Sequence, residues 1–234
     1  MSYADVIMDT PGLVAYYRLG ETSGNWLDSK GGNPLTIFSG PGGVRGVPGL
    51  LVGDPDKACQ HTNASQMFLT AAYGSYMDTG PELSVEWWMY IDPSATSSGN
   101  AVRRDDPPTW RFLVDGVQFG PITVLCLVYD TTDYISMYTP GGVITKGQVH
   151  HLVGTYSSTL GQVRFYSNAQ NYSAAPNRAP TTPVKVTNSI LRVGGGTQGV
   201  IDEVAIYNKA LTQEQVAQHY QAGLGNYPRI LGVN

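Results

Sequence analysis

Alternation of apolar and polar residues is the dominant pattern along this chain. The segment 83–91 places Leu, Val, Trp, Met and Ile at its odd positions. Successive side chains of a strand point to opposite sides of a sheet, so these positions predict one apolar face. The even positions include Glu86, Trp88 and Tyr90 and predict a second face that is amphipathic rather than simply polar.

Further segments are predicted to be strands on the same reasoning. They are 13–19, 66–70, 109–114, 122–130, 134–139, 148–156, 162–167, 189–193 and 200–207. Clusters of glycine and proline separate many of them, and these residues favour turns. Because no helix is expected between the strands, the pattern predicts an all-β fold of two packed antiparallel sheets. The segment 92–108 shows no such pattern and is predicted to be a mobile surface loop.

Two helices are expected at the ends of the chain. A short one is predicted at 2–9, with Ser2 as its cap and Pro11 beyond its end. A clearer one follows Thr212, which with Gln215 forms the sequence of a capping box, and Gly223 is placed to end it. We therefore expect one domain, 1–223, followed by a tail, 224–234.

Composition narrows the range of partners. Only 14% of the residues are charged, against about 25% in an average domain, and the net charge is −4. Such a surface argues against nucleic acid as a ligand. No run approaches the roughly 20 apolar residues that span a bilayer, so no membrane insertion is expected. The first residues do not form a signal peptide, which predicts synthesis and assembly in the cytoplasm.

The two cysteines are far apart in the sequence. Cys126 lies in an apolar run, which favours a buried free thiol, although a bridge to Cys59 stays an alternative. His150 and His151 are adjacent in a predicted strand and would point to opposite faces, one into the core and one to solvent. They are therefore not expected to bind a metal together.

Five sequence motifs occur in order along nearly the whole chain. They are LVAYYRLGETSG (13–24), LSVEWWMYI (83–91), HHLVGTYSS (150–158), LRVGGG (191–196) and VIDEVAIYNKALTQEQVAQHYQAG (200–223). Together they resemble the laminin-G-like and pentraxin-like jelly-roll domains of the concanavalin A-like lectin/glucanase superfamily. One departure is Val149, where an aromatic residue usually precedes the paired histidines.

The resemblance implies a jelly-roll sandwich whose first and last strands are adjacent. Its members act mainly in adhesion, glycan recognition or assembly, and only some are glycosidases. A retaining glycosidase needs two carboxylates about 5–5.5 Å apart. Glu86 lies among aromatic residues, where it could face a concave ligand surface; the one acidic residue two or four positions away is Glu82, and no E-x-D-x-x-E or similar set occurs. We therefore expect no catalytic residues and no enzyme activity.

A structural Ca²⁺ is a further expectation, although no cofactor is predicted to be required. The loop 28–33 offers the oxygen ligands that Ca²⁺ prefers. Similar jelly rolls hold Ca²⁺ in this region, and the matching residues are Asp28, Asn33 and Asp202. Alternatively, Asp28 and Asn33 only form turn hydrogen bonds, and Lys30 in the same loop would repel a cation.

Glycan binding would require exposed aromatic rings that stack on sugars. The candidates are Trp110, Tyr129, Tyr134 and Tyr138, with polar side chains from 130–133 between them. A position in the core or in a protein interface is the alternative for each of them.

Two functions of different class follow. The first is a structural or adhesion module of a bacteriophage virion, such as a minor tail, tail-tip or capsid-decoration protein. It would contact other virion subunits and copies of itself, and could attach to cell-surface glycans. The second is a free carbohydrate-binding lectin, and a glycoside hydrolase is a distant third.

Overall fold

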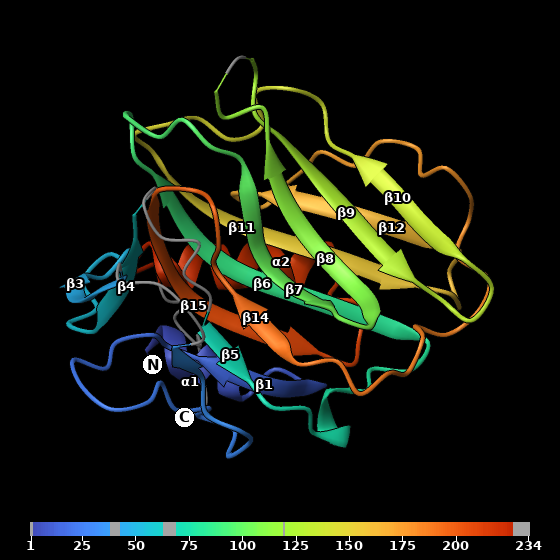
Figure 1. Cartoon of the computed structure of the whole chain (residues 1–234), viewed down its shortest axis with the longest axis horizontal. Helices are drawn as coiled ribbons and strands as arrows, with labels where there is room; N and C mark the ends of the chain where they lie inside the picture. The colour runs from blue at the N-terminus through green and yellow to red at the C-terminus, as the bar shows by residue number, and fades with distance from the viewer. Residues whose placement is uncertain (1, 38–42, 63–68, 119, 227–234) are drawn as a thin grey trace, which may run out of the picture.

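The computed structural model describes residues 2–37, 43–62, 69–118 and 120–226. In this part the chain forms two antiparallel sheets packed face to face, with two α-helices on the outside of one of them (Figure 1). This confirms the predicted β-sandwich with a short helix at each end. No described helix has the length and apolar character needed to cross a membrane.

The first sheet, named here the covered sheet, contains the centre of the fold. Its strand order is β13-β12-β11-β6-β15-β4-β3, and β1 also pairs with β15, so the first and last strands of the chain are adjacent. Its strands are β1 (Leu13–Tyr17), β3 (Gly43–Pro48), β4 (Lys57–His61), β6 (Glu82–Ile91), β11 (Val149–Ser157), β12 (Gln162–Ser167), β13 (Gln170–Asn171) and β15 (Gly199–Tyr207).

The second sheet, named here the open sheet, lies toward the viewer in Figure 1, and α2 lies behind the covered sheet. Its strand order is β10-β9-β8-β7-β14-β5-β2. Its strands are β2 (Thr36–Ile37), β5 (Leu69–Ala71), β7 (Gly99–Asp105), β8 (Pro108–Asp115), β9 (Thr123–Tyr129), β10 (Tyr134–Tyr138) and β14 (Leu191–Val193). A 3-10 turn, η1 (Ser75–Met77), leads from β5 to the covered sheet.

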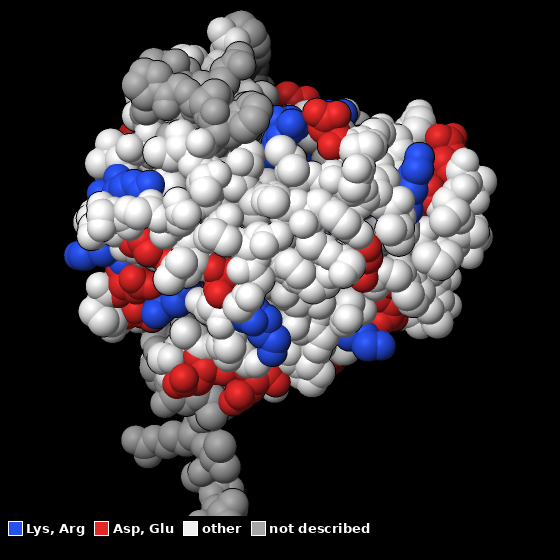
Figure 2. Space-filling model, turned by 60° about the horizontal axis from the view of Figure 1, so that its bottom comes forward, with Lys and Arg blue, Asp and Glu red and all other residues white. Residues whose placement is uncertain are grey.

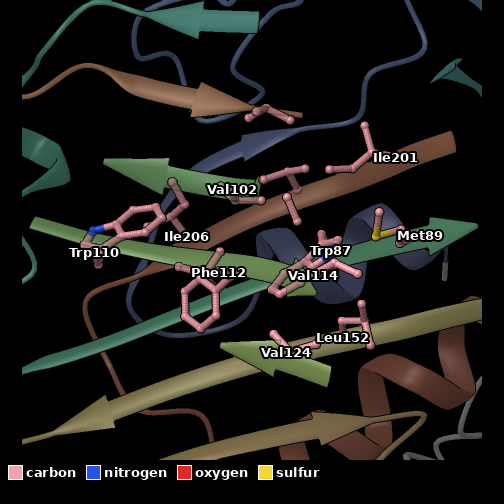
Figure 3. Close-up of a cluster of buried hydrophobic side chains, with 14 of the residues drawn as sticks. Trp87, Met89, Val102, Trp110, Phe112, Val114, Val124, Leu152, Ile201 and Ile206 are labelled. Atoms are coloured by element: carbon pink, nitrogen blue, oxygen red, sulfur yellow. The ribbon is translucent and has the colours of Figure 1, made fainter. Parts of the chain in front are cut away.

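The core between the sheets follows the alternation of β6. Its odd positions, from Leu83 to Ile91, are all buried in the main hydrophobic cluster. Figure 3 shows Trp87 of the covered sheet among side chains of the open sheet, with its ring 5.5 Å from that of Phe112. Cys59 and Cys126 are both buried as free thiols. The bridge between them is therefore absent from the structure.

The even face of β6 is covered by the helices. α1 (Tyr3–Met8) and α2 (Gln213–Gly223) begin at Ser2 and Thr212, and both starts form complete capping boxes. Between the helices and the sheet lies a second buried cluster that includes Tyr3, Trp88 and Val216. The amphipathic face predicted for β6 is thus an interface within the chain.

The segment 92–108 differs from its prediction. It contains β7, which pairs with β8 and β14 and buries Ala101 and Val102. Irregularities in the pairing with β8, between Asn100 and Val102 and again after Arg104, break the alternation. Apolar and polar residues therefore do not alternate regularly in this segment, although it forms a strand.

Some elements were not predicted, or lie partly outside the described residues. The strands β2, β3, β4 and β13 are short or lie near the edges of the sheets, where alternation gives little signal. Of the predicted strand 66–70, only 69–70 is described, and it belongs to β5. Residues 227–234 of the predicted tail lie outside the described residues.

Candidate functional site

The outer face of the open sheet is set by the alternation of β8, β9 and β10. In β8 the rings of Trp110 and Phe112 point into the core. In β10 the inward residues are Ile135 and Met137, which leaves Tyr134 and Tyr138 on the outer face. The chain therefore places an aromatic surface on the sheet face opposite the core.

Three of the four predicted aromatic residues gather on this face. Tyr129 lies opposite Tyr134 in the register of β9 and β10, and their rings are 6.1 Å apart. Tyr134 is 44% exposed and Tyr138 is 52% exposed, whereas Tyr129 is half-buried. We call Tyr129, Tyr134 and Tyr138 the tyrosine patch. An aromatic ring with one free face is the group that stacks on a sugar.

Trp110 does not belong to this patch. It is only 1% exposed and packs between the sheets, with its ring 6.1 Å from that of Phe112 (Figure 3). Alternation along β8 gives the reason, because Trp110 has the same parity as Phe112 and Val114 and points inward with them. The prediction that Trp110 contacts a glycan is therefore wrong.

The connection between β9 and β10 is held by Asp130. Its carboxylate accepts hydrogen bonds from the backbone N–H groups of Thr132 and Asp133 and from Arg178 at 2.7 Å. Burial opposes the charge, but these bonds prevail and lower the pKa of Asp130 to about 2. Asp130 therefore fixes the turn that presents Tyr134, rather than offering a free oxygen to a ligand.

Glu86 does not reach the surface of the protein. It is fully buried on the helix-covered face of β6 and accepts hydrogen bonds from Tyr3, Tyr207, His151 and His219. The position of Glu86 on a concave ligand face, suggested by the sequence, is wrong. Among the described residues, no other carboxylate lies in its hydrogen-bond network.

The two adjacent histidines do point to opposite faces, but neither reaches solvent. His151 donates to Glu86 under the helices, with 2.6 Å between Nε2 and the carboxylate. His150 is buried, and its Nε2 accepts the N–H of Thr145 at 3.1 Å. The expectation that one of them faces solvent is wrong because β11 is an interior strand with cover on both faces.

The residues predicted to hold Ca²⁺ form hydrogen bonds within the protein. The Asp28 carboxylate accepts hydrogen bonds from three backbone N–H groups, and the Asn33 amide donates to the carbonyls of 72 and 73. One oxygen of Asp202 accepts the N–H of Leu50, while the other has no partner within the described ranges. No three His, Cys, Asp or Glu side chains gather into a metal-binding group in the described residues. The predicted set therefore does not show the convergence that Ca²⁺ requires.

A buried carboxylate pair at 202–203 was not predicted. Glu203 lies where the register of β15 with β6 is interrupted, and it has a φ of 53°, which is uncommon for a non-glycine residue. It accepts hydrogen bonds from Tyr16 and Arg18. Burial raises the pKa of Glu203 to about 7, and burial together with the charge of Glu203 raises that of Asp202.

Arg18 connects this pair to a surface hollow. Its guanidinium also bonds Asp54 and Asp56 at 3.0 Å. A pocket of about 410 Å³ beside it is lined by Arg18, Leu27, Asp28 and Asp56, among others. Because Arg18 already pairs with three carboxylates, the pocket contains no free cationic group in its described lining.

Solved structures with the same fold include several binding domains. The binding domain of Paraclostridial Mosquitocidal Protein 1 aligns with a TM-score of 0.65 at 12% identity, over 90% of this chain and 52% of that one. This chain therefore spans about half the length of the toxin domain. The serotype D ligand binding domain of botulinum neurotoxin, in complex with N-acetylneuraminic acid, aligns with a TM-score of 0.61 at 13% identity, over 94% of this chain and 52% of that one.

A match over nearly a full domain is Domain 4 of AbnA, an extracellular arabinanase from Geobacillus stearothermophilus, in complex with arabinotriose. Its TM-score is 0.56 at 21% identity, with 89% of this chain and 98% of that one covered. No curated protein sequence matches this chain. Residues 63–217, more than half of the sequence, match the family model described as the concanavalin A-like lectin/glucanases superfamily. The chain belongs to that superfamily.

Proposed function

We propose that this chain is a non-enzymatic carbohydrate-binding module whose sugar contact is the tyrosine patch. The observation that supports this most is the exposure of Tyr134 and Tyr138 on a regular sheet face. Together with the half-buried ring of Tyr129 they gather on one face, and gathered apolar groups support a binding role more than single exposed residues do. Stacking on a sugar ring uses such a surface directly.

The fold relatives support the same class of function. One of them is an arabinanase domain solved with arabinotriose, and another is a toxin domain solved with N-acetylneuraminic acid. These ligands belong to those proteins, and the likeness to this chain is one of fold. It supports a jelly-roll binding module as a general class, and the particular sugar is set by the side chains of this chain.

The absence of enzyme activity is also part of the proposal. Glu86, the carboxylate that the sequence placed among aromatic residues, is buried beneath two helices and cannot touch a polymer substrate. Asp202 and Glu203 are buried as well. A retaining mechanism needs two carboxylates that both reach the scissile bond.

The test is a glycan-binding measurement with matched tyrosine variants. Wild type, Tyr134→Ala and Tyr138→Ala are compared on a glycan array and by calorimetry with the best glycan. Tyr90→Ala is the control, because Tyr90 is half-buried on the outer face of the covered sheet. We expect both patch variants to lose at least about tenfold in affinity. Unchanged affinity in both patch variants, or an equal loss in Tyr90→Ala, would contradict the proposal.

The narrower role that we propose is a module of a bacteriophage virion, with a free lectin as the alternative. Its support is the low content of charged residues, 14%, which suits packing against other subunits. Figure 2 shows acidic and basic side chains interspersed on a mostly uncharged surface. Mass spectrometry of purified particles tests this role. A protein absent from every particle but present in a secreted fraction would instead be a lectin.

A further inference from the structure

Three arginines stand opposite one another across adjacent strands of the open sheet. Arg192 of β14 is in register with Arg103 of β7, which is in register with Arg111 of β8. The neighbours of Arg111 in β8, Trp110 and Phe112, point into the core, so Arg111 points outward, and residues in register share its face. Strands lie about 4.8 Å apart, so these side chains leave the sheet within about 10 Å of one another. We call them the arginine row.

The arginine row brings three like charges close together. Like charges directly opposite each other on neighbouring strands are destabilising. The Nε atom of Arg111 is buried and has no hydrogen-bond partner among the described residues. A buried donor without an acceptor calls for an explanation, such as a ligand that supplies the missing acceptor.

Arg103 and Arg192 both have interaction partners, and the carboxylate that pairs with Arg192 is exposed. Arg192 pairs with Asp106 at 3.3 Å, and Asp106 is 76% exposed. Ion pairs at such exposed positions contribute little and are easily exchanged. An incoming anion could therefore replace Asp106 at small cost and would also satisfy Arg111.

The arginine row and the tyrosine patch share one face. The row continues from Arg111 to Leu127 of β9 and Ser136 of β10. Two residues further along the same face, Leu125 is in register with Tyr138. Leu125 and Leu127 are nearly buried, which makes an apolar floor between the cationic and the aromatic ends. The two ends are about two strand spacings apart, roughly 10 Å, which is a short distance for a saccharide to bridge.

We propose that this face binds an acidic glycan, with the arginine row holding a carboxylate or sulfate group of a sugar that lies on the tyrosine patch. Guanidinium groups match both oxyanions with two parallel hydrogen bonds. The saccharide part of this inference rests on the function proposed above, and the charge preference is new. No sequence pattern predicts this preference, because the three arginines lie on separate strands and up to 89 residues apart.

Two matched pairs of polymers test the preference. Polygalacturonate is compared with its methyl ester for the carboxylate, and dextran sulfate with dextran for the sulfate. We expect at least one acidic member to bind tenfold or more tightly than its neutral partner. Arg111→Gln should lower the ratio of acidic to neutral affinity to about one. Arg111→Lys should keep part of the preference for the acidic polymer, since Lys retains the charge without the bidentate geometry. Lys57→Gln, an exposed change of equal charge on the covered sheet, should keep the ratio.

The possible outcomes separate this inference from the proposed function. Equal binding of acidic and neutral members, still lost in Tyr138→Ala, would overturn the charge preference and leave the glycan-binding function standing. A preference that survives in Arg111→Gln and weakens equally in Lys57→Gln would be general charge attraction and would also overturn it. No binding of any of the four polymers would overturn the charge preference, and the glycan array would then decide the glycan-binding function separately. Thermal melts of each variant, run first, show that the compared proteins are folded.

Discussion

His219 of the closing helix donates a hydrogen bond to Glu86 of the central strand, with 2.9 Å between Nδ1 and the carboxylate. Tyr3 of the other helix donates to the same carboxylate at 3.0 Å. Burial disfavours the charge of Glu86, but the bonds and charges of His219 and His151 lower its pKa far below the ordinary value. Glu86 thus fastens both helices to the covered sheet, and its role is structural.

Glu86→Gln should destabilise the protein strongly. The Glu86 carboxylate accepts from four donors, and an amide would turn one of its oxygens into a donor that faces them. We expect a loss of about 2–4 kcal/mol in the free energy of unfolding, measured by urea denaturation. Glu82→Gln, on the same strand but at its half-buried end, should cost less than about 1 kcal/mol. A loss below 0.5 kcal/mol (about a twofold change in the folding equilibrium) for Glu86→Gln would contradict this role.

The pH dependence of stability should show two opposite slopes. The raised pKa of Glu203, about 7, means that the folded state binds a proton that the unfolded state releases above about pH 4.3. Stability should therefore increase as pH falls from 8 to 5, on the order of 1–3 kcal/mol. Glu86 has a lowered pKa, so its contribution is complete above about pH 4.3 and is lost as the pH falls below that.

Glu203→Gln separates the two slopes. It removes one titrating group of the buried pair, so the free energy of unfolding should change less between pH 5 and 8. The loss of stability below pH 4, which comes from Glu86, should remain. Chemical denaturation at closely spaced pH values measures both. An unchanged slope in the upper window would show that Glu203 is ionised in the folded protein at neutral pH, against the expectation.

Trp110→Ala and Tyr138→Ala should affect different properties. Trp110 is a core residue, so its truncation should cost about 3–5 kcal/mol of stability. Tyr138 is half exposed, so its truncation should cost less than about 1 kcal/mol and weaken glycan binding instead. Thermal melts and binding titrations on the same preparations measure both. A stable Trp110→Ala protein with specifically lost binding would contradict the core position.

Removal of divalent metal should leave the protein as stable as before. The oxygens of Asp28 already accept three backbone N–H groups, so Ca²⁺ would have to break those bonds to bind. We expect the melting temperature to change by less than about 2 °C between EDTA and millimolar CaCl₂. A larger rise with CaCl₂ that disappears in Asp202→Asn would instead support the site predicted at Asp28, Asn33 and Asp202.

Gly223→Ala should disturb the contact between α2 and the covered sheet. A Cβ atom at Gly223 would lie 2.1 Å from Cζ2 of Trp88, far inside contact distance. We expect a loss of about 1–3 kcal/mol from overpacking. Gly53→Ala is not a suitable control because of its positive φ, whereas Gly120→Ala meets no atom within 4 Å and should be nearly neutral. An equal effect of both changes would contradict the contact.

The sequence by itself determined the architecture. Strict alternation in 83–91 identified the core face of β6, and the capping sequences at Ser2 and Thr212 located both helices. These features are local, because the side-chain period and the cap bonds involve residues only a few positions apart. The ordered motifs also indicated the superfamily that the family match shows.

The tertiary structure alone decided which face each aromatic and charged group occupies. Alternation divides a strand into two faces but does not say which face meets the other sheet, so Trp110 and Tyr134 were equal candidates until the sheets were placed. The same holds for Glu86, whose partners come from both helices and two other strands. The arginine row exists only through the pairing of β14, β7 and β8, because register across a sheet depends on contacts between residues far apart in the chain.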